Sequence, residues 1–153
     1  MTHFTPSTIE LSGSVRVALS VDDAFALFSP EGERLWISEW DPEPLYPRGA
    51  DWTQGQIFRT KEERGDGVWV ISALDRAEHS VEYYRVEANR YVARVRVRCH
   101  GQGPSRTRAD VSYLFVGLSA QGNADIGEMT VDAYAEKMAR WQRWIDQALG
   151  ARR

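Results

Sequence analysis

Polar and hydrophobic residues alternate along several stretches of this chain, and a period of two is typical of half-buried β-strands. The first stretch, residues 9–19, places five apolar side chains on one face: Ile9, Leu11, Val15, Val17 and Leu19. Later stretches predict further strands over residues 56–61, 67–75, 80–88, 91–100 and 107–118. Gly65-Asp66-Gly67 and Asn89-Arg90 are suited to tight turns, so neighbouring strands should pair as antiparallel hairpins.

Two short helices are predicted after the first strand. Ser20 followed by Asp23 is a helix-start signal, and the short helix after it should carry Ala24, Phe25, Leu27 and Phe28. Pro30 is suited to open a second short helix that ends near Leu35 or Trp36. Prolines and glycines at positions 42, 44, 47 and 49 then predict irregular chain up to residue 55.

Near the end of the chain, apolar residues recur at steps of three and four. This period predicts one long amphipathic helix from Asn123 or Ala124 to Leu149. Its apolar face consists of Ile126, Thr130, Ala133, Tyr134, Met138, Trp141, Ile145 and Leu149. Charged residues of the same helix, among them Lys137, should face water.

Pairing across the hairpins predicts which side chains share a face of the sheet, because directly opposed residues point to the same side. With Asn89-Arg90 as a two-residue turn, Tyr84 lies opposite Val95 and Glu82 opposite Val97. The inner face then collects Tyr84, Val86, Ala93, Val95, Val97, Cys99, Val111, Tyr113 and Phe115. The outer, solvent-facing side collects Tyr83, Arg85, Arg94, Arg96, Arg98, Arg108 and Asp110.

Composition narrows the class of protein. The 153 residues are 42% hydrophobic and 27% charged, as in soluble globular proteins, and are expected to form one domain with a flexible tail over residues 1–7. No apolar run approaches the roughly 20 residues of a membrane helix, so no membrane insertion is expected. A single cysteine, Cys99, excludes an internal disulfide and indicates a cytoplasmic protein. The net charge of −3 does not favour nucleic-acid binding.

Few residues have the spacing of a reactive site. Cys99 should be a small buried hydrophobe, and the three histidines are scattered rather than arranged as metal ligands: His3, His79 and His100. Neither a metal nor another cofactor is therefore expected. The carboxylates Glu31, Glu33 and Glu39 are explained more simply by helix-start electrostatics and solvation than by acid–base chemistry.

Glu82 is the exception on the predicted inner face, where an unpaired carboxylate is costly. It would lie in water at the rim of a cavity, have a charged partner, or serve a ligand as a binding or acid–base group. Trp36 and Trp40 are large aromatic residues early in the chain, and they predict a wall or lid of such a cavity.

Several segments carry a family resemblance: Ser20-Val-Asp-Asp-Ala-Phe, Phe28-Ser-Pro-Glu-Gly-Glu-Arg-Leu-Trp, Trp40-Asp-Pro-Glu, Trp69-Val-Ile, Tyr84-Arg-Val and Gly117-Leu-Ser-Ala-Gln-Gly-Asn. Together they resemble the START-like, or SRPBCC, superfamily, which includes birch-pollen-allergen-type and polyketide cyclase/dehydrase-like proteins. The resemblance implies an α+β helix-grip fold over residues 1–153, with a curved antiparallel β-sheet wrapped around a long C-terminal α-helix and two short helices after the first strand. It implies a cavity between sheet and helix but supplies no catalytic residue, because the superfamily shares no catalytic motif.

Three kinds of function are compatible with this pattern. The first is binding of a small hydrophobic or amphipathic molecule in the cavity, with these candidate contacts: Trp36, Trp40, Trp69, Glu82, Tyr84, Val95, Val97, Tyr113, Tyr134, Met138 and Trp141. The second is an enzyme of the cyclase, dehydratase or hydrolase type, in which Glu82, Tyr84 and Tyr113 transfer or orient protons. The third is a protein-interaction module of the chaperone co-factor kind, and a homodimer is also open.

Overall fold

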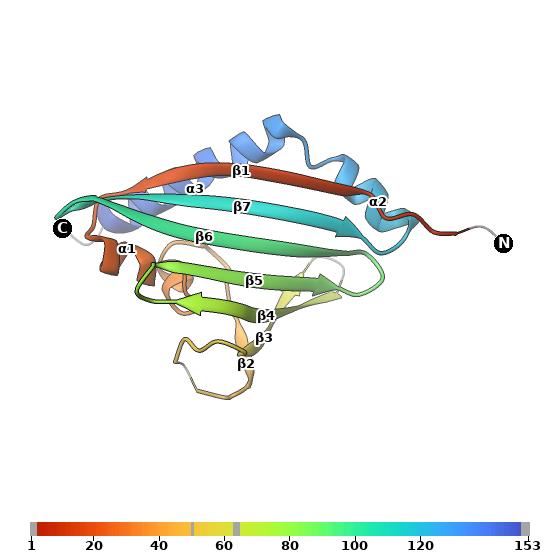
Figure 1. The fold of residues 1–153 in the computed structure, drawn as a ribbon, viewed down its shortest axis with the longest axis horizontal. Coiled ribbons are helices and arrows are strands. Elements are labelled where there is room, and N and C mark those ends of the chain that lie inside the picture. Colours follow the sequence, from red (N-terminus) through yellow and green to blue (C-terminus); the bar gives the residue numbers. More distant parts are fainter. Residues whose placement is uncertain (1–2, 50, 63–64, 151–153) are drawn as a thin grey trace.

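The computed structural model describes residues 3–49, 51–62 and 65–150. Within these ranges, seven strands form one antiparallel sheet in the order β1-β7-β6-β5-β4-β3-β2. The strands are β1 (Thr8–Val17), β2 (Glu43–Tyr46), β3 (Ile57–Glu62), β4 (Gly65–Asp75), β5 (Ser80–Glu87), β6 (Tyr91–Gly103) and β7 (Arg106–Gly117). The helices are α1 (Val21–Ala26), the short 3-10 helix η1 (Gly32–Leu35), α2 (Ala120–Gly127) and α3 (Val131–Gly150). Figure 1 shows α3 behind the β1–β7 side of the sheet, and the face toward α3 is called the inner face.

Both short helices form after β1, as the sequence predicts, although the second begins at Gly32 rather than at Pro30. The Ser20 hydroxyl accepts a hydrogen bond from the Asp23 N–H at 3.3 Å and caps α1. Gly32 lies so close to α1 that an added Cβ would be 1.9 Å from the Ala26 carbonyl oxygen. Glycine at this position therefore lets η1 pack against α1.

Two elements differ from the predicted pattern. Residues 43–46 lie in the stretch predicted to be irregular, yet they form β2 and pair with β3. The predicted single C-terminal helix is two helices, because Ser119 caps an earlier start and Thr130 caps a second helix within the predicted span. Ser119 Oγ accepts a hydrogen bond from the Gly122 N–H at 3.0 Å, and Thr130 Oγ1 accepts one from the Ala133 N–H at 3.1 Å. Each cap starts a new helix at its own position.

The β5–β6 register is one residue away from the prediction. The connection has three residues, 88–90, rather than two, and Asn89 adopts a positive φ of 62°. Tyr83 therefore pairs with Val95, Tyr84 with Arg94, and Glu82 with Arg96. Because a one-residue slip reverses the faces of a strand, the predicted faces of β5 are wrong. The inner side chains of this strand are Val81, Tyr83, Arg85 and Glu87, and the outer ones include Glu82, Tyr84 and Val86.

In the β6–β7 hairpin, the inner residues are those that the sequence predicts. Val95 pairs with Tyr113 and Val97 with Val111, which is two residues from the predicted register. A shift of two preserves the faces, so the predicted inner residues of β6 and β7 are all buried: Ala93, Val95, Val97, Cys99, Val111, Tyr113 and Phe115.

The core lies between the inner face and α3. From α3, the buried side chains are Tyr134, Met138, Trp141 and Ile145. The Trp141 ring lies 5.1 Å from the Trp36 ring, and the Tyr134 hydroxyl donates to the Val111 carbonyl oxygen at 2.6 Å. Aromatic pairs of this kind add about 0.5–1.5 kcal/mol to the stabilisation from area burial.

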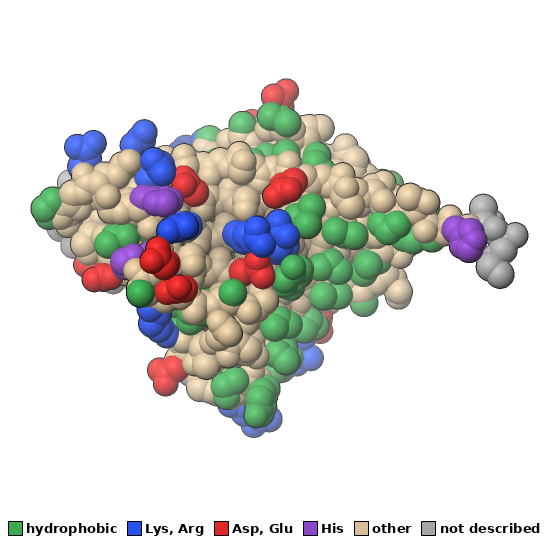
Figure 2. Space-filling model, viewed as in Figure 1, with side chains coloured by type: hydrophobic (Ala, Val, Ile, Leu, Met, Phe, Trp, Pro, Cys, Tyr) green, Lys and Arg blue, Asp and Glu red, His purple; other side chains and the backbone are tan. Residues whose placement is uncertain are grey.

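The outer face of the sheet has two zones (Figure 2). An apolar zone spans β3 to β7 at the end nearer the N-terminus, and it consists of Ile57, Val68, Val70, Tyr84, Val86, Val92, Leu114 and Val116. The other end is charged, with ion pairs such as Arg96–Glu82 and Arg98–Glu78. The predicted charged exterior is therefore confirmed for only part of this face.

The segment before β1 is held by α2. Asn123 Oδ1 accepts a hydrogen bond from the Ser7 N–H at 2.8 Å, and Asn123 Nδ2 donates to the Thr5 carbonyl oxygen at 3.1 Å. Residues 1–2 of the predicted tail lie outside the described residues. Within the described ranges, no helix combines the length and the apolar character needed to cross a membrane.

Candidate functional site

A cavity of about 690 Å³ opens between the inner face of the sheet and the segment from Pro30 to Glu43. Strands β3 to β7 supply its sheet side, and Trp141 of α3 also lines it. Four lining residues form an aromatic wall: Trp40, Phe58, Trp69 and Tyr83. Within the wall, the Phe58 and Trp69 rings stack at 5.5 Å, and the Trp40 ring meets Trp69 edge-on at 5.6 Å.

The polar atoms of the aromatic wall are already bonded to the protein. Trp40 Nε1 donates to the Pro30 carbonyl oxygen at 2.8 Å, and Trp69 Nε1 donates to Thr60 Oγ1 at 2.9 Å. The Tyr83 hydroxyl donates to the Phe28 carbonyl oxygen at 2.7 Å. The wall therefore offers mainly apolar ring surface to the cavity.

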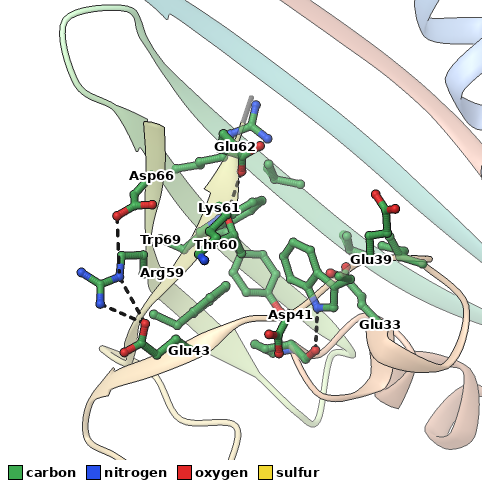
Figure 3. Close-up of a pocket in the computed structure, with 18 of the residues that line it drawn as sticks. Glu33, Glu39, Asp41, Glu43, Arg59, Thr60, Lys61, Glu62, Asp66 and Trp69 are labelled. Atoms are coloured by element: carbon green, nitrogen blue, oxygen red, sulfur yellow. Dashed lines mark hydrogen bonds and ion pairs between the residues drawn. The ribbon is translucent and has the colours of Figure 1, made fainter. Parts of the chain in front are cut away.

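Charged side chains surround the opening of the cavity. Arg59 contacts Glu43 at 2.9 Å and Asp66 at 3.9 Å, which links β2, β3 and β4 (Figure 3). On the segment that faces β3, Glu33 and Glu39 line the opposite side. Charged side chains therefore line the opening of the cavity, whereas its interior carries the aromatic wall.

Arg85 is the cationic residue among the inner side chains of β5 that line the cavity. Its guanidinium lies over the Trp69 ring at 5.3 Å and the Tyr91 ring at 5.6 Å. Nη2 donates to the Tyr91 hydroxyl at 3.3 Å, while Nε is buried and has no hydrogen-bond partner among the described residues. The ion pair to Glu87 is long, at 4.0 Å. The charge of Arg85 is thus only partly compensated.

Lys137 of α3 extends inward rather than toward water, so its predicted solvent-facing position is wrong. Its Nζ lies 3.9 Å from the centre of the Tyr113 ring and 5.6 Å from that of Trp141, and both rings line the cavity. Burial, followed by repulsion from Arg85 and Arg140, lowers the pKa of Lys137 from 10.5 to about 7.

Glu33 of η1 lines the same cavity. Burial raises the pKa of its carboxyl well above 4.5, although attraction to Lys137 acts in the opposite direction. Burial also raises the pKa of Tyr113 well above its ordinary value. Burial therefore disfavours the charged forms of both Glu33, which lines the cavity, and Lys137, which contacts two of its lining rings.

The predicted cavity residues fall into three groups. Those that line the cavity are Trp40, Trp69, Val95, Val97, Tyr113 and Trp141. Those that are buried in the core outside its lining are Trp36, Tyr134 and Met138. Glu82 and Tyr84 lie on the outer face, so their predicted inward direction is wrong.

Glu82 has its partners on the outer face. It accepts a hydrogen bond from Arg96 Nε at 2.6 Å and another from Ser72 Oγ at 2.8 Å. Partial burial would raise the pKa of this carboxyl, but the two donors outweigh burial and hold the pKa below 4.5. Glu82, Tyr84 and Tyr113 therefore do not converge at a cavity floor, which overturns the predicted proton-transfer group.

Sequence reasoning missed Arg85 and Glu33 as lining residues of the cavity, and Lys137 as a contact of its rings. For Arg85, the decisive signal was the length of the β5–β6 turn, because a three-residue turn brings the odd-numbered residues of β5 inward instead of the even-numbered ones. For Lys137, the signal was its position four residues before Trp141, on the flank of the buried helix face. A long lysine side chain on such a flank can reach inward over an aromatic ring.

No metal site emerges from the described part of the chain, where no group of three His, Cys, Asp or Glu side chains could hold an ion. His79 contacts Asp22 at 2.7 Å and His100 contacts Asp110 at 3.1 Å. Cys99 is buried, and burial raises the pKa of its thiol to about 12, so the unreactive thiol form is favoured.

No protein-family model and no curated protein matches this sequence. Solved structures match it over nearly their whole length. Norcoclaurine synthase from Thalictrum flavum has a TM-score of 0.67 at 12% identity, over 99% of this chain and 100% of that chain. Ginseng major latex-like protein 151 from Panax ginseng has a TM-score of 0.66 at 14% identity, over 92% and 96%. The chain has the helix-grip fold of these structures.

A third helix-grip structure, the Zhui aromatase/cyclase from Streptomyces sp. R1128, has a TM-score of 0.57 at 18% identity, over 95% of this chain and 88% of that chain. Identities this low show the fold alone. The predicted helix-grip fold is thus confirmed, and the function must be argued from this chain's own cavity.

Proposed function

We propose that this helix-grip protein binds a small molecule with an apolar, ring-bearing body in the cavity between the sheet and α3. The aromatic wall carries the proposal. The cavity volume of about 690 Å³ falls within the roughly 300–1,000 Å³ of small-molecule sites. Because the indole N–H groups of Trp40 and Trp69 are bonded to the protein, the wall favours a ligand through ring stacking and area burial.

The proposed contacts are the lining residues that the sequence also indicates: Trp40, Trp69, Val95, Val97, Tyr113 and Trp141. Trp36, Tyr134 and Met138 would shape the cavity from behind. One solved structural neighbour, norcoclaurine synthase from Thalictrum flavum, is in complex with dopamine and hydroxybenzaldehyde. That complex supports ring compounds as the first class of ligand to test.

Titration with N-phenyl-1-naphthylamine, a neutral fluorescent two-ring probe, tests the proposal. Val95→Phe places a bulky ring in the cavity, whereas Val92→Phe makes the same change on the outer face of the same strand. We expect saturable binding to the wild type and to Val92→Phe, and about tenfold weaker binding to Val95→Phe, because overpacking removes ligand space. Absence of saturable binding, or equal binding by both variants, would contradict a cavity site.

Catalysis in the same cavity is a second candidate, favoured by Glu33 and Lys137. A buried amine with a pKa of about 7 is suited to act as a general base near neutral pH. Ring opening of 5-nitrobenzisoxazole reports such a base, because removal of its C–H proton breaks the N–O bond. We expect a rate that rises through pH 7 and is lost in Lys137→Met but kept in Arg96→Met, which removes a cation from the outer face. If Lys137→Met leaves the rate unchanged, Lys137 is not the general base.

A third candidate is an interaction between two copies of this chain. The two copies would contact each other through the apolar zone of the outer face. Side chains of both signs, Arg94 and Glu10, meet at 3.5 Å beside this zone, so a second copy related by a two-fold axis could exchange the pair. Sedimentation of the wild type and Val92→Asp over a concentration series tests it. A monomer at all concentrations, or a dimer that survives Val92→Asp, would reject it.

A further inference from the structure

Building on the proposed function, we propose that the ligand is an organic anion whose acidic oxygen group is held by Arg85 and Lys137. Its rings would lie against the aromatic wall, and its charged group would reach toward Tyr113. The chemical class is an amphipathic carboxylate, phenolate or enolate. The inference concerns the charge of the ligand, whereas the proposed function concerns its apolar body.

The first observation is the incomplete bonding of Arg85. A guanidinium has five N–H donors in a fixed fork, and this one makes a single hydrogen bond, at 3.3 Å, to a neutral hydroxyl within the described residues. Nη1 makes no hydrogen bond to them, although the side chain lines the cavity and is 16% exposed. Buried charges are normally paired and hydrogen-bonded. Glu87 Oε2 is buried without a hydrogen-bond partner among the described residues and stays 4.0 Å from Nη2, so Arg85 keeps donors free for a further acceptor.

The second observation is that Lys137 of α3 reaches two rings that line the cavity, Tyr113 and Trp141. No carboxylate of the described chain lies within 4.0 Å of its Nζ, whose close contacts are the Tyr113 and Trp141 rings. Among the charged groups that act on Lys137, Arg85 is the strongest, and it is repulsive. Two cations that repel each other across one enclosed space would both be stabilised by an anion between them.

The carboxylates near this end do not supply that anion. Glu62 Oε1 accepts a hydrogen bond from Thr60 Oγ1 at 2.7 Å, and Glu87 reaches Arg85 only at 4.0 Å. Burial raises the pKa of the Glu33 carboxyl, which disfavours its charged form. A cationic ligand would add a third positive charge beside Arg85 and Lys137, so the arrangement selects an anion.

Two probes of nearly equal shape test the inference. 8-Anilinonaphthalene-1-sulfonate carries one sulfonate that N-phenyl-1-naphthylamine lacks, and the rings are otherwise the same. We expect the wild type to bind the sulfonate about tenfold more tightly at pH 6.5, because a charge-assisted hydrogen bond contributes about that factor. Arg85→Met should remove this preference and leave the neutral probe within about twofold. Arg96→Met, on the outer face, should change neither affinity, because Arg96 pairs with Glu82 away from the cavity.

The outcomes separate the two ideas. If neither probe binds, the proposed cavity function fails. If both probes bind equally to the wild type, or if Arg85→Met weakens both alike, the cavity function stands and the anion inference is overturned. Arg85→Lys provides a second check, since it keeps the charge without the fork and should restore part of the preference for the sulfonate. No recovery in a folded Arg85→Lys protein would also contradict a charge-based role.

Discussion

Replacing Lys137 with methionine should make the protein more stable at neutral pH. The pKa of the amine falls from 10.5 to about 7 on folding. At about 1.4 kcal/mol for each pKa unit, burial of the charged amine costs roughly 5 kcal/mol. Methionine would lose the attraction to the Tyr113 and Trp141 rings, about 2 kcal/mol at a desolvated site. The expected net gain in unfolding free energy is therefore about 3 kcal/mol.

The pH dependence of this gain gives a stricter check. Below pH 7, Lys137 is charged in the folded and unfolded states, and the cost of burial is complete. Between pH 7 and 10.5 the folded protein releases the proton first, so the cost shrinks as pH rises. Urea unfolding followed by tryptophan fluorescence should show the gap between wild type and Lys137→Met narrowing over that range.

The exposed Lys61 supplies a control, because Lys61→Met removes the same charge without burial. We expect that variant to stay within about 0.5 kcal/mol of the wild type at every pH. The reasoning would be refuted by a Lys137→Met protein that is less stable than the wild type at pH 7. A constant gap from pH 6 to pH 10 would refute it as well.

Other predictions concern the same inner face. Glu33→Gln should stabilise the protein at pH 7, because the buried carboxyl is costly to ionise in the folded state. Below pH 4.5 the carboxyl is protonated in both the folded and the unfolded state, so the gain should disappear. Unfolding curves of both proteins at pH 4 and pH 7 measure the difference. The affinity for 8-anilinonaphthalene-1-sulfonate should fall as pH rises through 7, because Lys137 then loses its positive charge. The charged groups that act on Lys137 are Arg85, Arg140, Glu33 and Glu62. An affinity that does not change with pH would count against a role of Lys137 in holding the anion. Gly32→Ala should cost about 2–4 kcal/mol by overpacking η1 against α1, as thermal unfolding would show. Glu82→Gln should leave binding of both probes unchanged, and a tenfold loss would restore the rejected inward placement.

Much of the fold follows from local patterns in the sequence. Alternation locates β1 and β3 to β7, and the Ser20 signal locates α1, because each rests on neighbouring residues alone. The division into α2 and α3 depends on competition between the Thr130 cap and a continuous helix, which the apolar period does not reveal. β2 lies in a segment rich in proline, and it forms only because β3 offers it a pairing edge.

The candidate site was harder to predict than the fold, because one turn decides it. The faces of β6 and β7 survive a register error of two residues, so Val95 and Tyr113 lie inward as expected. On β5 an error of one residue exchanges Glu82 for Tyr83 and Tyr84 for Arg85. The sequence therefore indicates the wrong carboxylate, Glu82, and places Arg85, which lines the cavity, toward solvent.

The most direct test of the cavity function is the indole N–H region of a nitrogen-15 NMR spectrum during titration with N-phenyl-1-naphthylamine. Trp40, Trp69 and Trp141 line the cavity, whereas Trp52 and Trp144 do not. We expect saturable shifts of the first three signals and little change in the other two. Absence of saturable shifts, or shifts confined to Trp52 and Trp144, would contradict the account.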